Sequence, residues 1–136
     1  MSDTEKISIN VGAVDLGTID LLVDQGLYAN RTDLIRTAIR NQLDRHADVV
    51  EKAVSRHSMV IGVVRLNRTE LEARVKMSEK LRLSLVGVLR IGSDVSPELA
   101  SSAIDRIQIF GVIRASDDVK EALSDRIQQF ATLYSK

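Results

Sequence analysis

The sequence predicts an α+β fold in two parts: a short strand with two helices, then a repeated strand-and-helix segment with parallel strands. Residues 6–11 alternate apolar and polar side chains with the two-residue period of a strand. Residues 14–25 and 31–45 place apolar side chains at helical spacing. Beyond residue 59, one five-residue pattern occurs three times at nearly constant spacing, which is typical of a βαβαβα repeat.

The first strand has an apolar face and a polar face. The apolar face carries Ile7, Ile9 and Val11. The polar face carries Lys6, Ser8 and Asn10. A lone strand cannot satisfy its backbone hydrogen bonds, and no partner strand follows within hairpin distance. The simplest partner is the same strand of a second copy, paired antiparallel about a two-fold axis. Such a ribbon fits the major groove of DNA, where Lys, Ser and Asn are residue types that read base edges.

Two helices are expected after this strand. Gly26 stands where a left-handed cap ends the first helix. Asn30 is placed to cap the second helix, with Asp33 positioned to bond back. Free backbone N–H groups at Asn30, Arg31 and Thr32 suit a DNA phosphate. The predicted dimer core combines the apolar strand face with the apolar stripe of the second helix: Ile7, Ile9, Val11, Leu34, Ile35, Ala38 and Ile39.

The segment KISINVGAVDLGTIDLLVDQGLYANRTDLIRTAIRNQL resembles the ribbon-helix-helix domain of CopG-like and Arc-like bacterial regulators. The resemblance covers residues 5–46 approximately, about the first third of the chain. It implies a dimer with an intertwined antiparallel strand pair, base contacts from the outward strand positions and phosphate contacts from the start of the second helix. These positions are Lys6, Ser8 and Asn10 for bases, and Asn30, Arg31 and Thr32 for phosphates.

Two plainer interpretations stay open for these residues. The polar strand face is also compatible with a solvated surface on a ribbon that serves dimerisation alone. Asn30 and Thr32 are residue types that commonly cap helices without binding any ligand. The net charge is zero, with 19 basic and 19 acidic residues, and residues 1–58 are slightly acidic. A single dimer is therefore expected to bind DNA weakly, with useful affinity coming from several dimers side by side.

The composition argues against several other classes of protein. There is no cysteine, which excludes disulfides and cysteine catalysis. His46 and His57 lie about three helical turns apart, too far to bind one metal ion. Neither a nucleophile motif nor a phosphate-cradling glycine loop is apparent, so we expect no enzyme, cofactor or metal. Because no secretion signal or membrane-spanning run is present, a cytoplasmic protein is expected.

The second half is predicted to contain three strand-and-helix units after a helical linker at residues 47–58. No Gly or Pro interrupts the second helix before Ser58, so it is expected to continue into this linker. The repeated strand pattern is apolar-Gly-Val-apolar-Arg, and it occurs at 61–65, 86–90 and 110–114. The predicted helices span 69–81, 98–107 and 118–133, with caps at Asn67, Ser96 and Ser116.

Residues 59–136 are therefore interpreted as a three-unit βα repeat domain with parallel strands, following a dimerisation and DNA-binding domain at 1–46. The repeat weakly resembles leucine-rich repeats in architecture, and an open α/β layer has the same period. The repeated glycines are expected to allow helices to pack closely on strands. Arg65, Arg90 and Arg114 are expected to form a solvated row, with an anion or acidic partner as the alternative.

Together these patterns predict a sequence-specific DNA-binding regulator, most simply a repressor, acting as a homodimer or higher oligomer. Its ribbon would enter the major groove, and residues 59–136 would serve oligomerisation or the binding of a partner or effector. Double-stranded DNA and a second copy of the chain are the expected partners, and a membrane is not. The alternative is an antitoxin or scaffold protein that uses the ribbon for dimerisation alone.

Overall fold

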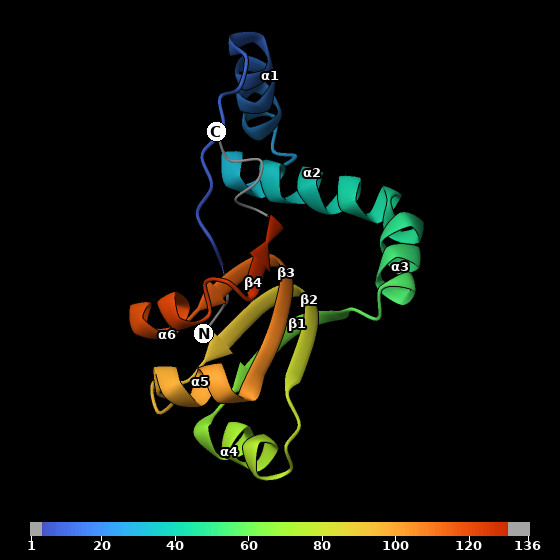
Figure 1. Cartoon of the computed structure of the whole chain (residues 1–136). Coiled ribbons are helices and arrows are strands. Elements are labelled where there is room, and N and C mark those ends of the chain that lie inside the picture. Colours follow the sequence, from blue (N-terminus) through green and yellow to red (C-terminus); the bar gives the residue numbers. More distant parts are fainter. Residues whose placement is uncertain (1–3, 131–136) are drawn as a thin grey trace. The chain divides into compact units, whose positions relative to one another are not determined.

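The computed structural model describes residues 4–130 and divides into two compact units, residues 1–52 and 53–136 (Figure 1). The first unit contains α1 (Ala13–Asp24) and α2 (Arg31–Arg45), and α3 (Ala47–Arg56) spans the boundary. Residues 4–12 adopt neither helix nor strand in this single chain. The strand predicted at 6–11 is thus not formed in the single chain.

The end of α1 confirms the predicted glycine cap. Gly26 has φ of +82°, in the left-handed region where a residue without Cβ carries little cost. Its N–H donates to the carbonyl of Val23 at 3.0 Å, and the N–H of Leu27 donates to the carbonyl of Leu22 at 3.1 Å. These two bonds satisfy carbonyls that the end of a helix leaves open, so the chain turns sharply toward α2.

The start of α2 confirms Asn30 as its cap. The Asn30 side chain accepts the N–H of Asp33 at 2.8 Å. The carboxylate of Asp33 bonds back to the N–H of Ala29 at 2.9 Å, one residue earlier than a capping box requires. Both interactions fix the entry of the chain into the helix.

The predicted continuation of α2 to Ser58 is wrong at one position, His46. The N–H of His46 bonds to the carbonyl of Leu43, three residues back, at 3.0 Å, and its backbone leaves helical geometry. Its ring nitrogen Nε2 lies 3.3 Å from Nε2 of Gln42. The helix restarts as α3 at Ala47. A local change from a four-residue to a three-residue hydrogen bond breaks the helix without any Gly or Pro.

The second unit is a four-stranded parallel sheet with strands in sequential order β1-β2-β3-β4. Its elements are β1 (Val60–Leu66), α4 (Arg68–Lys76), β2 (Leu81–Ile91), α5 (Pro97–Ala103), β3 (Ile104–Arg114), α6 (Asp117–Ala122) and β4 (Ile127–Gln129). The parallel strands agree with the prediction, and β4 is a fourth strand that the sequence interpretation missed. Because right-handed crossovers between sequential strands emerge on one side, α4, α5 and α6 lie together on one face (Figure 1).

The core of this unit lies between the sheet and its helices. Leu71 on α4, Leu85 and Leu89 on β2, and Ile107 and Ile109 on β3 are fully buried. The three predicted N-caps are confirmed, with Asn67, Ser96 and Ser116 each accepting a backbone N–H of the following helix. Capping sets the directions of the helices, and their apolar faces then close over the sheet.

Each helix of this unit ends earlier than the sequence predicts. The helix expected at 98–107 ends at Ala103, and Ile104 already belongs to β3. The helix expected at 69–81 ends at Lys76, and that expected at 118–133 ends at Ala122, although residues 131–133 lie outside the described range. Isoleucines and leucines near these boundaries fit either element, and pairing with a neighbouring strand selected the strand.

The repeated glycines form a ladder across three strands. Gly62, Gly87 and Gly111 pair in register, and all have φ between +133° and +140°. A Cβ built on Gly87 would lie 2.0 Å from the carbonyl oxygen of Gly62, and one on Gly111 would lie 2.0 Å from that of Gly87. The predicted reason, close packing of helices on strands, is therefore wrong. The glycines allow neighbouring strands to share one irregular backbone conformation.

Candidate nucleic-acid interface

The described part of the first unit has no hydrophobic core of its own. Within its described part, residues 4–52, no residue is buried in the single chain. The exposed fractions are 73% for Ile7 and 68% for Ile9, and large apolar residues of the helices are also open to solvent. A surface of this kind is costly in water at roughly 25 cal/mol for each Å² of apolar area. In the single chain, this unit therefore leaves apolar surface in contact with water.

The seven predicted dimer-core residues are exposed to different degrees. Leu34 and Ile35 are half-buried, and α1 and α2 contact each other. Val11, Ala38 and Ile39 are exposed, the first and last at 40% and 45%. The intramolecular packing of α1 on α2 therefore covers part of the stripe and leaves the remainder uncovered.

The predicted base-reading residues are all accessible. Lys6, Ser8 and Asn10 lie in the irregular segment before α1, and each is exposed. One protomer does not gather them into a common surface, because neighbouring side chains of an unpaired segment have no fixed face.

The start of α2 forms a concave site. A pocket of about 490 Å³ is lined by Ala29, Asn30, Thr32, Asp33 and Arg36. Two of the three predicted phosphate-binding residues, Asn30 and Thr32, are therefore together in it. The sequence analysis did not predict Arg36 as a phosphate ligand. Its position four residues after Thr32, one helical turn along α2, is a signal that the sequence contains. The first-turn N–H groups and the Arg36 guanidinium supply the donors that an anion needs.

Arg31, the third predicted phosphate ligand, has a different partner. Its guanidinium forms a bidentate pair with Asp20 on α1, with Nε–Oδ1 at 2.7 Å and Nη2–Oδ2 at 2.8 Å. The hydrogen bond from Arg31 holds the pKa of Asp20 below its ordinary value. The same hydrogen bond raises the pKa of the guanidinium. Arg31 thus joins the two helices, while its backbone N–H remains at the helix start.

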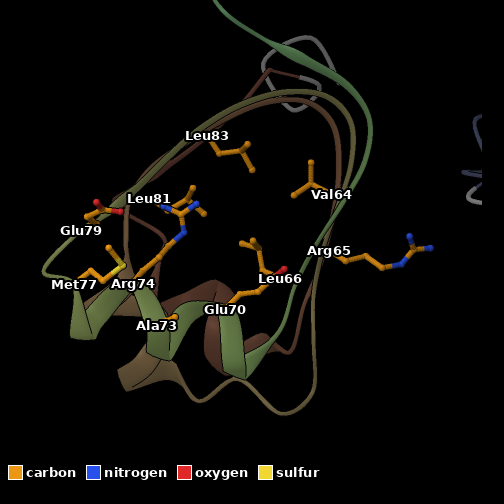
Figure 2. A pocket seen from close by; sticks show the side chains of 10 residues that line it. All are labelled: Val64, Arg65, Leu66, Glu70, Ala73, Arg74, Met77, Glu79, Leu81 and Leu83. Carbon is orange, nitrogen blue, oxygen red and sulfur yellow. The ribbon is translucent and has the colours of Figure 1, made fainter.

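A second, larger hollow lies in the sheet unit, between α4 and the first two strands. It has a volume of about 540 Å³ (Figure 2). Apolar side chains such as Leu66, Leu81 and Leu83 line its interior, and Glu70 and Arg74 stand at its floor. Figure 2 shows the strands arching over these side chains, with Arg65 extending outward from the rim.

Comparison with known proteins identifies the family. The family model described as the ribbon-helix-helix transcriptional regulator family matches residues 2–120, most of the chain and parts of both units. The chain belongs to the ribbon-helix-helix transcriptional regulator family. This membership confirms the resemblance seen at residues 5–46, and ribbon-helix-helix regulators are dimeric DNA-binding proteins.

A curated relative matches a stretch of the chain. It is the transcriptional regulator CdrS of Halobacterium salinarum, 27% identical over 44 residues, which make up 32% of this chain and 80% of that protein. No solved structure matches the chain. Within residues 4–130 of this ribbon-helix-helix protein, no helix combines the length and apolar character needed to cross a bilayer.

Proposed function

We propose that the chain is a sequence-specific repressor that binds DNA as a homodimer. Residues 6–11 of two protomers pair antiparallel into a ribbon that enters the major groove. Lys6, Ser8 and Asn10 then stand on the DNA-facing side, and Ile7, Ile9 and Val11 on the other. Residues 1–46 make up this dimerisation and DNA-binding domain. Residues 47–58 link it to the sheet domain at 59–136.

The observation that supports the dimer is the uncovered apolar surface of the first unit. Ile7 and Ile9 are far too exposed for a stable protomer, and Ile39 is exposed at 45% on α2. The alternation of residues 6–11 puts both strand isoleucines on one face once the segment is extended. Pairing of two copies would cover this apolar face and would also satisfy the backbone hydrogen bonds of the strand.

The site at the start of α2 supports the proposed phosphate contacts. Asn30, Thr32 and Arg36 line one pocket. The first N–H groups of a helix have no carbonyl partner within that helix. Arg31 contributes through its backbone N–H, since its side chain is paired with Asp20. These contacts position the ribbon without reading sequence, which is the usual division of roles between phosphate and base contacts.

The sheet domain is proposed to join dimers into higher oligomers. Its helices cover one face, whereas parallel sheets are normally covered on both. Strand register places two apolar rows on the opposite face: Ile61, Val86 and Phe110, then Val63, Val88 and Val112. Ile61 is 59% exposed and Val63 is 42% exposed. Association through this face would array ribbons along DNA and offset the weak binding expected of one slightly acidic dimer.

The test is a mobility-shift titration of the double variant Lys6→Ala, Asn10→Ala on DNA selected from a random pool. Each bidentate base contact contributes about 1–3 kcal/mol of discrimination, so the selected site should lose at least about tenfold in affinity. The matched control, Asn41→Ala with Lys52→Ala, changes the same residue types on exposed positions of α2 and α3. It should bind nearly as the wild type does.

Two results would remove parts of this proposal. Equal binding of the selected site by the wild type and the Lys6→Ala, Asn10→Ala variant would exclude the base contacts. A protein that dimerises and yet selects no DNA sequence would favour the alternative of a scaffold or antitoxin. In that case the ribbon would serve dimerisation alone.

A further inference from the structure

Three arginines start from neighbouring positions at the amino-terminal ends of three strands. Arg82 on β2 pairs in register with Arg106 on β3. Arg126 directly precedes β4, and its carbonyl accepts the N–H of Ile107 at 2.9 Å. Because adjacent strands lie about 4.8 Å apart, the three side chains emerge side by side from one edge of the sheet.

These arginines line a concave, polar pocket of about 470 Å³, which we call the arginine pocket. Its other lining residues are Asp105, Asp125, Ile127 and Gln128. Sites for small molecules commonly have volumes of roughly 300–1,000 Å³ with a few convergent polar groups. The arginine pocket has the size of such a site, and all of its lining residues belong to the sheet domain.

Two of the three guanidinium groups are held in place by the protein. Arg82 donates from Nε to Oδ2 of Asp105 at 2.6 Å. The hydrogen bond from Arg82 holds the pKa of Asp105 below its ordinary value. Nη1 of Arg126 donates to the backbone carbonyls of Ser101 and Ile104 at the end of α5. Each of these arginines retains further N–H donors beyond the ones used here.

Arg106 lies between them and differs from both. It is exposed, and its guanidinium makes neither a hydrogen bond nor an ion pair with any residue from 4 to 130. The pocket lining contains three arginines and two aspartates, which leaves one positive charge in excess. An unpartnered guanidinium between two anchored ones is suited to an anion, because the anchored groups lose little freedom on binding.

We propose that the arginine pocket binds a small molecule through an oxyanion group, a carboxylate or a phosphate ester, with Arg106 as its principal ligand. The planar fork of a guanidinium donates two parallel hydrogen bonds to either group. Arg82 and Arg126 supply additional donors from the two sides. Asp125, whose side chain is 79% exposed, limits the total charge that the pocket accepts. Such a molecule would be an effector acting on the sheet domain, and its binding does not depend on DNA.

The experiment follows the arginine Nε–H signals of the full-length protein by ¹⁵N-correlated NMR. Inorganic phosphate and citrate are titrated separately at constant ionic strength, set with chloride. We expect saturable shifts at Arg82, Arg106 and Arg126 with at least one of the two anions. Saturation by phosphate alone identifies a phosphate-bearing ligand, and saturation by citrate alone identifies a carboxylate.

Matched variants separate this site from general attraction of anions. Arg106→Gln should weaken the affinity for the binding anion by about tenfold or more, since hydrogen bonds to charged groups are the strong ones. Arg65→Gln removes the same charge from an exposed position on β1 and should leave the affinity unchanged. Asp125→Asn should strengthen binding, a change that a merely structural role would not produce.

The proposal is overturned if neither anion gives saturable shifts at these three arginines, or if Arg65→Gln and Arg106→Gln weaken binding equally. Arg106→Lys keeps the charge and removes the fork, so intermediate affinity is expected of it. These titrations contain no DNA. A negative result in the mobility-shift test would therefore not change what they show about anion binding.

Discussion

Arg31 on α2 donates two hydrogen bonds to Asp20 on α1, one from Nε and one from Nη2, at 2.7 and 2.8 Å. This pair holds the two helices together beside the proposed phosphate site. It also places a carboxylate near the position where DNA would bring further negative charge. The pair therefore connects the geometry of the first unit with its affinity for DNA.

Replacement of Asp20 by Asn should raise DNA affinity without changing sequence preference. The substitution removes one negative charge and releases the Arg31 guanidinium, which then becomes available to a phosphate. Mobility shifts at several salt concentrations should show a steeper dependence, by about 0.9 in the logarithmic slope for each added phosphate contact per dimer site. Asp24→Asn, an equal charge change at the end of α1, should leave the slope unaltered; equal slopes for both variants would exclude a role for Arg31.

The Asp20–Arg31 pair also predicts a dependence on pH. The pKa of Asp20 is lowered from its ordinary value of 3.8 by the hydrogen bond from Arg31. A carboxyl group of this kind contributes stability above its unfolded pKa, and the contribution disappears as pH falls through the lower folded pKa. Titration of the side-chain carboxyl by ¹³C NMR should give a midpoint below 3.8. Arg31→Gln should bring it back toward that value, and an unchanged midpoint would contradict this assignment.

Ile39 tests whether the first unit gains its core from a second copy. Ile39→Glu puts a charge into the proposed dimer core and should dissociate the dimer, which sedimentation equilibrium measures directly. Val75→Glu is a matched control, because Val75 on α4 is exposed at 41% against 45% for Ile39. It should remain dimeric. A dimer that tolerates Ile39→Glu as well as Val75→Glu would place the interface elsewhere.

The glycines of the chain should respond to alanine in opposite directions. Gly87→Ala should destabilise the protein most, because its Cβ would meet the backbone of Gly62 and its φ is +140°. Gly62→Ala has open space but φ of +134°, so it should cost about 1–3 kcal/mol from backbone strain alone. Gly17→Ala, inside α1, would place its Cβ more than 4 Å from any atom beyond the neighbouring backbone of the helix, so it should stabilise by about 1 kcal/mol.

Chemical denaturation of the three variants measures these differences. The order of stability should be Gly17→Ala above the wild type, then Gly62→Ala, then Gly87→Ala. If Gly62→Ala and Gly87→Ala cost the same, the close approach between strands contributes nothing beyond the unusual φ. Reversal of the sign at Gly17 would show that its helix is not formed as described.

Helix starts were the part of the fold that the sequence predicted best. Asn30, Asn67, Ser96 and Ser116 all cap helices as expected, because a cap depends on atoms only three residues apart. Helix ends were predicted poorly wherever no glycine marked them. The break at His46 has no residue type that requires it, and the early end of α5 at Ala103 depends on pairing between β2 and β3.

The candidate sites show the same division. The location of Asn30 and Thr32 at a helix start followed from capping residues, whereas the pairing of Arg31 with Asp20 depends on how α2 packs beside α1. The arginine pocket was not foreseen at all. Arg126 belongs to no repeated motif, and β4, which brings it beside Arg106, was interpreted as helix.

The sequence by itself determined the three repeated strands and their parallel sheet, the helix starts and the alternating pattern of residues 6–11, since these depend on periodicity and on contacts between near neighbours. The tertiary structure decided where strands replace helices, why Gly62, Gly87 and Gly111 are required, and which charged groups meet. Those features arise from atoms that are distant in the chain and adjacent in space. Their energies, from backbone contact between strands to ion pairs between helices, do not exist until the chain has folded.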